Sequence, residues 1–320
     1  MSEPDPQARP PADAGPRPLE PLVGPQDVTS GHLRALLRTA RPRQWIKNLL
    51  VFSAPGAAGV LTHPRALAHS VEAFAIFCLA ASGVYFMNDA FDRESDRHHP
   101  EKSRRPVAAG VVSVREAAAG AAVGLGGAAL IGAVLLGGEF ALAVGVYAVI
   151  NFAYGLWLKH EPILDLAAVA SGFLLRAIAG GLAVGVPLSD WFLIVAAFGS
   201  LFMVAGKRQV DHRVLEGGAP RRGAMAAYTQ QFLRFIRGVA AAVAITAYCV
   251  WAFEKAALVP RGDIFFELSI VPFVLAILRY ALLLEGGAGG SPEDVVLGDP
   301  PILILGVVWV ALFAAGVYGA

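Results

Sequence analysis

Runs of apolar residues long enough to cross a membrane recur along this chain. Nine such runs can be delimited, at residues 44–62, 68–90, 114–136, 139–157, 163–185, 190–211, 231–253, 264–284 and 301–319. A transmembrane α-helix needs about 20 apolar residues to cross a hydrocarbon layer about 30 Å thick. The sequence therefore predicts an all-α, polytopic membrane protein with about nine transmembrane helices.

The composition agrees with a membrane protein and argues against a nucleic-acid partner. Hydrophobic residues make up 56% of the chain and charged residues 16%, whereas about a quarter of the residues of a soluble domain are charged. The formal net charge is only +1, so we expect no nucleic-acid binding. Cys78 and Cys249 both lie in apolar runs, where we expect small core residues and no metal site.

The N-terminal part of the chain differs from the rest. Residues 1–30 contain eight of the 21 prolines and no apolar stretch typical of a secretory signal peptide, so we expect a disordered tail. Residues 31–43 place leucines on one side and arginines on another. That pattern favours an amphipathic helix on an anionic membrane surface, or a simple basic anchor. Residues 44–320 are expected to form the catalytic transmembrane domain.

Lysine and arginine are distributed unevenly between the two sides of the predicted membrane. With alternating spans, nearly all of them fall on the side of the N-terminus, and the other side receives only Arg65, Lys255 and Arg261. Because basic loops stay in the cytoplasm, we predict a cytoplasmic N-terminus, an outer C-terminus and a place in the plasma membrane. The polar clusters described next would then face the cytoplasm.

The end of the second apolar run carries a group of acids. If its helix continues, Asn88, Asp92 and Asp96 lie one turn apart on one face, with Asp89 at the edge of that face. Like charges so placed repel one another, and a Mg²⁺ ion shared with a substrate diphosphate would relieve the repulsion. A charged, solvated helix end is the alternative. Basic groups that could bind a diphosphate follow in the next loop, chiefly Lys102 and Arg105.

Three further polar groups lie on the same predicted side. Lys159, after the fourth run, could bind a phosphate, whereas Tyr154 could equally be an interfacial aromatic residue. Arg176 lies inside the fifth run, where a charge is costly unless it lines a polar cavity or has a structural partner. Lys207 and Asp211 are four residues apart, so they share a helix face and could bind a ligand or each other.

These motifs resemble the UbiA superfamily of intramembrane prenyltransferases. The first signature of that family is matched by Asn88-Asp89-x-x-Asp92-x-x-x-Asp96, followed by Pro100-x-Lys102 and Arg105-Pro106-x-x-x-Gly110. The second signature is usually an aspartate pair after the sixth span, and here it reads Lys207-x-x-x-Asp211. The lysine makes this cluster a weaker metal site and a better anion site than an aspartate pair.

Within the superfamily, the lysine favours the branch that transfers phosphoribose to a polyprenyl phosphate such as decaprenyl phosphate. Three further stretches of this chain resemble that branch: Arg41-Pro-x-Gln44-Trp45-x-Lys47-Asn48, Tyr154-x-x-x-x-Lys159 with Asp165, and Gly172-Phe-Leu-Leu-Arg176. The resemblance implies phosphoribosyl diphosphate as donor, Mg²⁺ as cofactor, and a product that leads toward a lipid-linked arabinose donor for cell-wall arabinan.

The resemblance also assigns roles to residues. It implies Mg²⁺ ligation by Asp89, Asp92 and Asp96, and catalysis by these three with Lys102 and Arg105. The substrate-binding residues that it implies are Asn88, Lys47, Asn48, Tyr154, Lys159, Arg176, Lys207 and Asp211. Two other functions are open to the same sequence: prenyl transfer from a diphosphate to an aromatic acceptor, and transport of an anion. Membrane lipids are expected neighbours, and the faces of small residues would permit a homo-oligomer.

Overall fold

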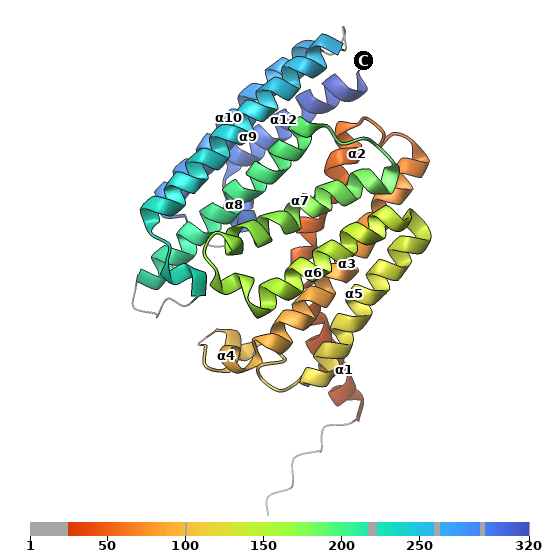
Figure 1. Ribbon diagram of the computed structural model, residues 1–320, viewed down its shortest axis with the longest axis vertical. Helices are drawn as coiled ribbons and strands as arrows, with labels where there is room; N and C mark the ends of the chain where they lie inside the picture. Colours follow the sequence, from red (N-terminus) through yellow and green to blue (C-terminus); the bar gives the residue numbers. More distant parts are fainter. Residues whose placement is uncertain (1–24, 100, 217–222, 259–262, 289–291, 320) are drawn as a thin grey trace, which may run out of the picture.

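The structure is a computed structural model that describes residues 25–99, 101–216, 223–258, 263–288 and 292–319, and every regular element among them is helical (Figure 1). Eight helices in these ranges are long and apolar enough to cross a membrane. They are α3 (Pro64–Phe91), α5 (Val114–Leu136), α6 (Gly138–Leu156), α7 (Leu164–Val184), α8 (Asp190–Glu216), α9 (Gln230–Leu258), α10 (Asp263–Glu285) and α12 (Pro300–Tyr318). The predicted all-α, polytopic membrane fold is confirmed.

The first predicted span, residues 44–62, is not a single α-helix. It consists of a 3₁₀ helix, η1 (Pro42–Phe52), followed by the short α2 (Ser53–Ala57). The backbone of η1 lies directly against α7, because a Cβ placed on Gly180 would come 1.8 Å from the carbonyl oxygen of Val51. A 3₁₀ helix rises about 2.0 Å per residue, against 1.5 Å for an α-helix. Eleven residues therefore reach further than they would in an α-helix.

The spanning helices pack in two groups that meet at α7 and α8. One apolar core joins α3, α5, α6 and α7 with η1, and includes Phe77, Phe140 and Tyr147. Separate cores join α8, α9, α10 and α12, with Phe202 and Trp251 among their buried residues. In Figure 1 α9, α10 and α12 run side by side, and α7 and α8 lie between them and the helices α3, α5 and α6.

Close approach of helices in the first group depends on small residues. A Cβ on Gly124 of α5 would lie 2.7 Å from the Cα of Gly83 in α3. The start of α5 is fixed by a capping box in which Ser113 and Glu116 each bind the other's backbone N–H. The contact between Gly124 and Gly83 holds the C-terminal half of α3 against α5, which follows the acidic group in the chain.

The N-terminal helix α1 (Pro25–Ala40) begins inside the segment expected to be a disordered tail, and residues 1–24 lie outside the described residues. It ends at Ala40, before the expected boundary at residue 43. Ala35 is buried against Val107 and Val112, and His32 lies 3.1 Å from Glu116. The helix is therefore attached to the protein as well as placed at its surface.

Short helical elements lie in the connections near the predicted site. They are α4 (Arg93–Arg97), η2 (Lys102–Arg104), η3 (Leu158–His160), η4 (Gly223–Ala226) and α11 (Pro292–Gly298). Figure 1 shows α4 and α1 at the same end of the bundle. The acidic group, Lys102, Arg105 and Lys159 are carried by these connections and by the helix ends next to them, whereas Arg176 lies inside α7.

Candidate functional site

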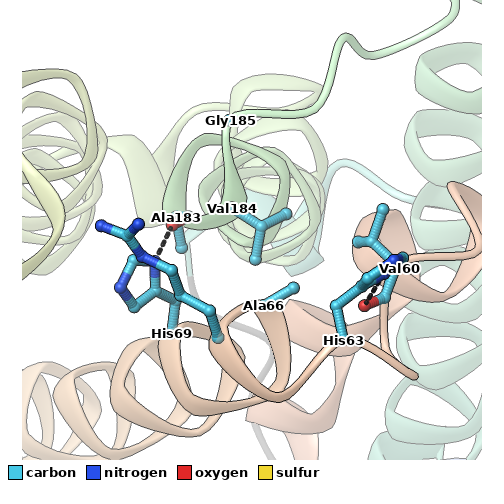
Figure 2. Close-up of a pocket in the computed structure, with 8 residues that line it drawn as sticks. Val60, His63, Ala66, His69, Ala183, Val184 and Gly185 are labelled. Carbon is cyan, nitrogen blue, oxygen red and sulfur yellow. Dashed lines mark hydrogen bonds between the residues drawn. The ribbon is translucent and has the colours of Figure 1, made fainter.

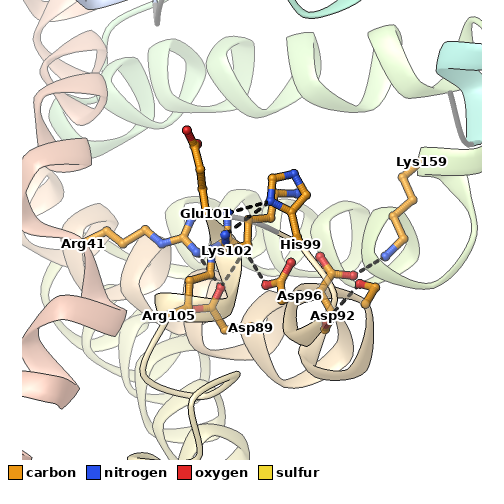
Figure 3. Close-up of polar contacts among 10 residues, drawn as sticks. Arg41, Asp89, Asp92, Asp96, His99, Glu101, Lys102, Arg105 and Lys159 are labelled. Atoms are coloured by element: carbon orange, nitrogen blue, oxygen red, sulfur yellow. Dashed lines mark hydrogen bonds and ion pairs between the residues drawn. The ribbon is translucent and has the colours of Figure 1, made fainter. Parts of the chain in front are cut away.

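The acidic group lies at the junction of α3 and α4. The α3 helix ends at Phe91, and Asp92 is the junction residue, with a ψ of 1° that departs from helical geometry. Asp89 and Asp96 are buried, with 2% and 3% of their surface exposed, whereas the Asp92 side chain is 32% exposed. The predicted continuous helix is interrupted, yet the three carboxylates still lie next to one another (Figure 3).

Each of these carboxylates is paired with a basic side chain from elsewhere in the chain (Figure 3). Arg41 binds Asp89. Arg105 Nη1 donates to Asp96 Oδ2 at 2.7 Å and lies 3.4 Å from Asp89 Oδ1. Lys159 Nζ donates to Asp92 Oδ1 at 2.6 Å.

The donor set at this junction fits a hard divalent cation. Three carboxylates lie next to one another there (Figure 3), and the nearby Asn88 Oδ1, which faces Gly155 of α6, is buried without a hydrogen-bond partner among the described residues. Mg²⁺ prefers oxygen ligands and keeps several waters, so it needs only one or two carboxylates. No three acidic, histidine or cysteine groups of the described chain are arranged to hold a metal ion together. A metal ion held at this junction would therefore share its coordination with water and with oxygens of a ligand.

Arg41 was quoted from the sequence only as the start of a motif and was given no role in the site. It has a left-handed backbone, with φ 52° and ψ 62°, at the start of η1, a conformation that is uncommon for residues other than glycine. Its guanidinium lies over the Tyr85 ring, 4.8 Å from the centroid, and pairs with Asp89. Besides that motif, its position before Pro42 is a local signal, since proline disfavours a helical conformation in the preceding residue.

The second cluster is larger than the Lys207–Asp211 pair. Lys207 Nζ lies 3.3 Å from Asp211 Oδ1, and Arg208 Nη1 lies 3.5 Å from Asp211 Oδ2. Arg208 also forms a two-pronged pair with Asp165, through Nε at 2.9 Å and Nη2 at 2.6 Å. Tyr154 donates to the same carboxylate at 3.1 Å and accepts from Arg208 at 2.9 Å. Tyr154 is therefore part of a polar network and is not only an interfacial aromatic residue.

Arg176 has structural partners deep in the bundle. Its Nε donates to Asn48 Oδ1 at 2.7 Å, Nη1 to the Gly172 carbonyl at 2.6 Å, and Nη2 to the Tyr147 hydroxyl at 3.0 Å. Only 7% of Arg176 is exposed, and Asn48 is fully buried. These contacts support the structural alternative for Arg176 and Asn48, whose substrate contact stays a prediction.

Lys47, which belongs to η1, contacts an acid of α11. Its amine lies 3.4 Å from Glu293 Oε1 of α11, and the positive charges of Lys207 and Arg176 are close enough to act on it electrostatically. The predicted substrate-binding lysines 47 and 207 thus share one electrostatic environment. Lys102, in contrast, is exposed, and its backbone N–H donates to His99 Nδ1 at 3.3 Å.

One pocket lies beside the acidic group, and another lies far from it. A pocket of about 610 Å³ borders Arg41 and is also lined by Arg38 and Arg43. Another, of about 490 Å³, lies between the start of α3 and the end of α7 (Figure 2). There His69 Nδ1 binds the Ala183 carbonyl at 3.2 Å. This second pocket is separated from the acids by nearly the whole length of α3, roughly 35 Å at 1.5 Å per residue.

Comparison with known proteins was made by sequence and by structure. Residues 49–297 match the sequence profile of the UbiA prenyltransferase family. The decaprenyl-phosphate phosphoribosyltransferase of Mycolicibacterium smegmatis is 42% identical over 93% of this chain and 96% of its own length. The enzyme of the same name from Mycobacterium tuberculosis is 43% identical over 92% of this chain and 96% of its own length.

Solved structures resemble the fold at low sequence identity. A UbiA homolog from Archaeoglobus fulgidus bound to GPP and Mg²⁺ has a TM-score of 0.68 at 20% identity, over 89% of this chain and 98% of that one. A homolog from Aeropyrum pernix without ligand has a TM-score of 0.62 at 19% identity, over 85% and 98% of the two chains. The helical arrangement is therefore shared across widely diverged sequences.

Proposed function

Because the chain belongs to the UbiA prenyltransferase family, we propose that it transfers 5-phosphoribose from phosphoribosyl diphosphate to a polyprenyl phosphate. One observation carries the proposal: relatives named decaprenyl-phosphate phosphoribosyltransferase match over nine-tenths of the chain at 42–43% identity. The lysine at position 207 supports it, because a second anionic substrate needs a cationic site rather than a second pair of acids.

Asn88, Asp89, Asp92 and Asp96 would hold a Mg²⁺ ion together with the donor diphosphate. Such an ion neutralises charge that develops on the leaving diphosphate. The fit rests on the unpartnered Asn88 oxygen and the adjacent carboxylates. The solved Archaeoglobus fulgidus homolog bound to GPP and Mg²⁺ supports the same use of the fold.

The basic partners of the carboxylates have a second role in this proposal. Arg41, Arg105 and Lys159 neutralise the acids in the ligand-free site. When the donor binds, these side chains turn to the phosphate oxygens, where they bind and orient the diphosphate. The site therefore exchanges one set of ion pairs for another, which limits the cost of leaving any charge unpaired.

The transfer itself needs no protein base. A phosphate oxygen of the acceptor attacks C1 of the ribose while the bond between C1 and the diphosphate oxygen breaks. The electrons of that bond leave with the diphosphate, and C1 is inverted as positive charge develops on the ring, as in glycosyl transfer. The acceptor phosphate is already ionised near neutral pH. Lys207 and Lys47 would orient it by charge.

The proposal also places the reaction at the cytoplasmic face of the plasma membrane. The uneven distribution of lysine and arginine between the predicted loops supports this orientation. The product, a polyprenyl phosphate that carries phosphoribose, would be the precursor of a lipid-linked arabinose donor for cell-wall arabinan.

The test is transfer of label by purified protein in lipid vesicles. With Mg²⁺, ribose-labelled phosphoribosyl diphosphate and polyprenyl phosphate, the label should enter the lipid fraction. A matched reaction receives labelled prenyl diphosphate and an aromatic acceptor. Label that enters lipid-soluble product only in that second reaction would overturn the proposal in favour of aromatic prenyl transfer.

A further inference from the structure

The short helix α11 places an acid beside the predicted lysine site. Val295 of α11 is buried in the core formed with Phe202 and Tyr280, which anchors the helix to the α8–α12 group. Two residues earlier, Glu293 reaches Lys47 of η1, in the other group of helices. The contact between Glu293 and Lys47 thus joins the two groups of helices.

The pair between Glu293 and Lys47 is longer than the shortest ion pairs of the site. Its two atoms are 3.4 Å apart, whereas Lys159–Asp92 and Arg208–Asp165 are each joined at 2.6 Å. Glu293 Oε1 is buried and has no hydrogen bond of good geometry among the described residues. A buried carboxylate oxygen without a hydrogen bond is unfavourable, so this contact is the most easily replaced of the three.

The surroundings of Lys47 favour an anion. Besides Glu293, the positive charges of Lys207 and Arg176 also act on Lys47. Next to Lys47 in η1, Ile46 and Leu49 expose 44% and 52% of their surface. A group with a phosphate and an apolar chain would find a cationic partner and an apolar surface side by side.

We propose that Glu293 occupies the phosphate position of the lipid acceptor in the free protein and is displaced when that acceptor binds. The inference rests on the proposed function, since it assigns Lys47 to the acceptor phosphate rather than to the ribose 5-phosphate. Glu293 is then a specificity-determining residue, because an acceptor must compete with its carboxylate for the Lys47 amine. Acceptors with a doubly charged phosphate displace it, and neutral polyprenols do not.

The experiment measures steady-state transfer and direct binding for the wild type, Glu293→Gln and Asp294→Asn. Asp294→Asn is the matched control, because it removes the same charge from an exposed position on the same helix. We expect Glu293→Gln to lower KM for polyprenyl phosphate by roughly two- to tenfold, the range of a partly exposed ion pair. Its KM for phosphoribosyl diphosphate and its kcat should stay unchanged. Farnesyl phosphate, as a short binding probe, should bind the variant more tightly by a similar factor.

Several outcomes overturn the inference. A higher or equal KM for the lipid in Glu293→Gln would make the acid a supporting or inert group, and a lower KM for phosphoribosyl diphosphate would assign Lys47 to the other substrate. If Asp294→Asn had the same effect as Glu293→Gln, the lower KM would reflect only the loss of one negative charge from α11 and not the contact with Lys47. If the wild type transfers phosphoribose but the variant binds farnesyl phosphate like the wild type, only this inference fails. If the wild type neither transfers phosphoribose nor binds the probe, the proposed function fails with it.

Discussion

Two aspartates of the site should respond in opposite ways to the same isosteric change. Asp92 is 32% exposed and has one basic partner, Lys159. Asp165 is buried and is joined to Arg208 and Tyr154 by three hydrogen bonds. Replacing either by asparagine keeps the shape and removes one negative charge, so the surroundings decide the consequence.

For Asp92→Asn we expect a large loss of activity with little loss of stability. A partly exposed ion pair contributes about 1 kcal/mol or less to folding. The loss of a group that helps to stabilise the developing charge costs about 10²- to 10³-fold in kcat, or roughly 2.7–4 kcal/mol. The fold of the variant should therefore resist heat almost as well as the wild type.

For Asp165→Asn we expect the reverse order of effects. Removing one partner of a buried ion pair costs about 3–5 kcal/mol, because it leaves the other charge uncompensated. Arg208, with its side chain 19% exposed, would keep only Asp211 as an acidic partner. The variant should lose a large part of its thermal stability, and any loss of activity should follow the loss of folded protein.

The assay compares both variants with the wild type in the same detergent micelles. Thermal unfolding is followed by intrinsic tryptophan fluorescence, and transfer is measured at a temperature at which all three remain folded. Unchanged turnover of Asp92→Asn would remove the acidic group from the reaction. An Asp165→Asn protein as stable as the wild type would show that Arg208 is not held as the structure places it.

Three further changes test other parts of the molecule. Lys207→Asp should lower phosphoribosyl transfer by about tenfold or more, because an acid repels the second anionic substrate; normal transfer would argue against an anion-binding lysine. Removal of divalent metal by a chelator should abolish transfer and added Mg²⁺ should restore it, whereas full activity in excess chelator would exclude a metal-bound diphosphate. Gly180→Ala should separate η1 from α7, because its Cβ would meet the Val51 carbonyl at 1.8 Å, and a lower unfolding temperature checks this.

A pH dependence of stability is expected at the start of α12. A hydrogen bond from Arg279 lowers the pKa of the Asp299 carboxyl, and Asp299 also accepts the Ile302 N–H at 3.0 Å. A carboxyl group with a lowered folded-state pKa stabilises the fold above its unfolded pKa of about 3.9, and that contribution is lost as the pH falls through the folded pKa. Asp299→Asn should therefore unfold at a lower temperature than the wild type at pH 7, and the difference should shrink in acid.

The sequence predicted the fold class and the family well, because apolar length and acidic spacing are local properties. Eight of the predicted runs are helices of spanning length, and the resemblance to the UbiA superfamily is confirmed. The exception is η1, a 3₁₀ helix whose backbone lies directly against Gly180 of α7. Such an approach is a tertiary contact, so no pattern within residues 44–62 could reveal it.

The candidate site was predicted in its acids and less well in their partners. Asp89, Asp92 and Asp96 do lie together, but their basic partners come from three different connections, including the unpredicted Arg41. Glu293 also went unnoticed, because a single acid in a polar connection has no distinctive spacing. The roles of all these residues in binding and catalysis stay predictions that the experiments above address.

The 3₁₀ form of η1 gives its side chains a period of three. In such a helix residues three apart lie directly above one another. Trp45, whose indole donates to Ser82, therefore stands in line with the buried Asn48 and Val51. Ile46 and Leu49 form an outward row that is half exposed. Adding a single residue would turn every later side chain by about 120° and exchange these rows, whereas adding three would restore them. The register of the side chains in this segment, rather than their hydrophobicity, decides that Lys47 lies beside Glu293.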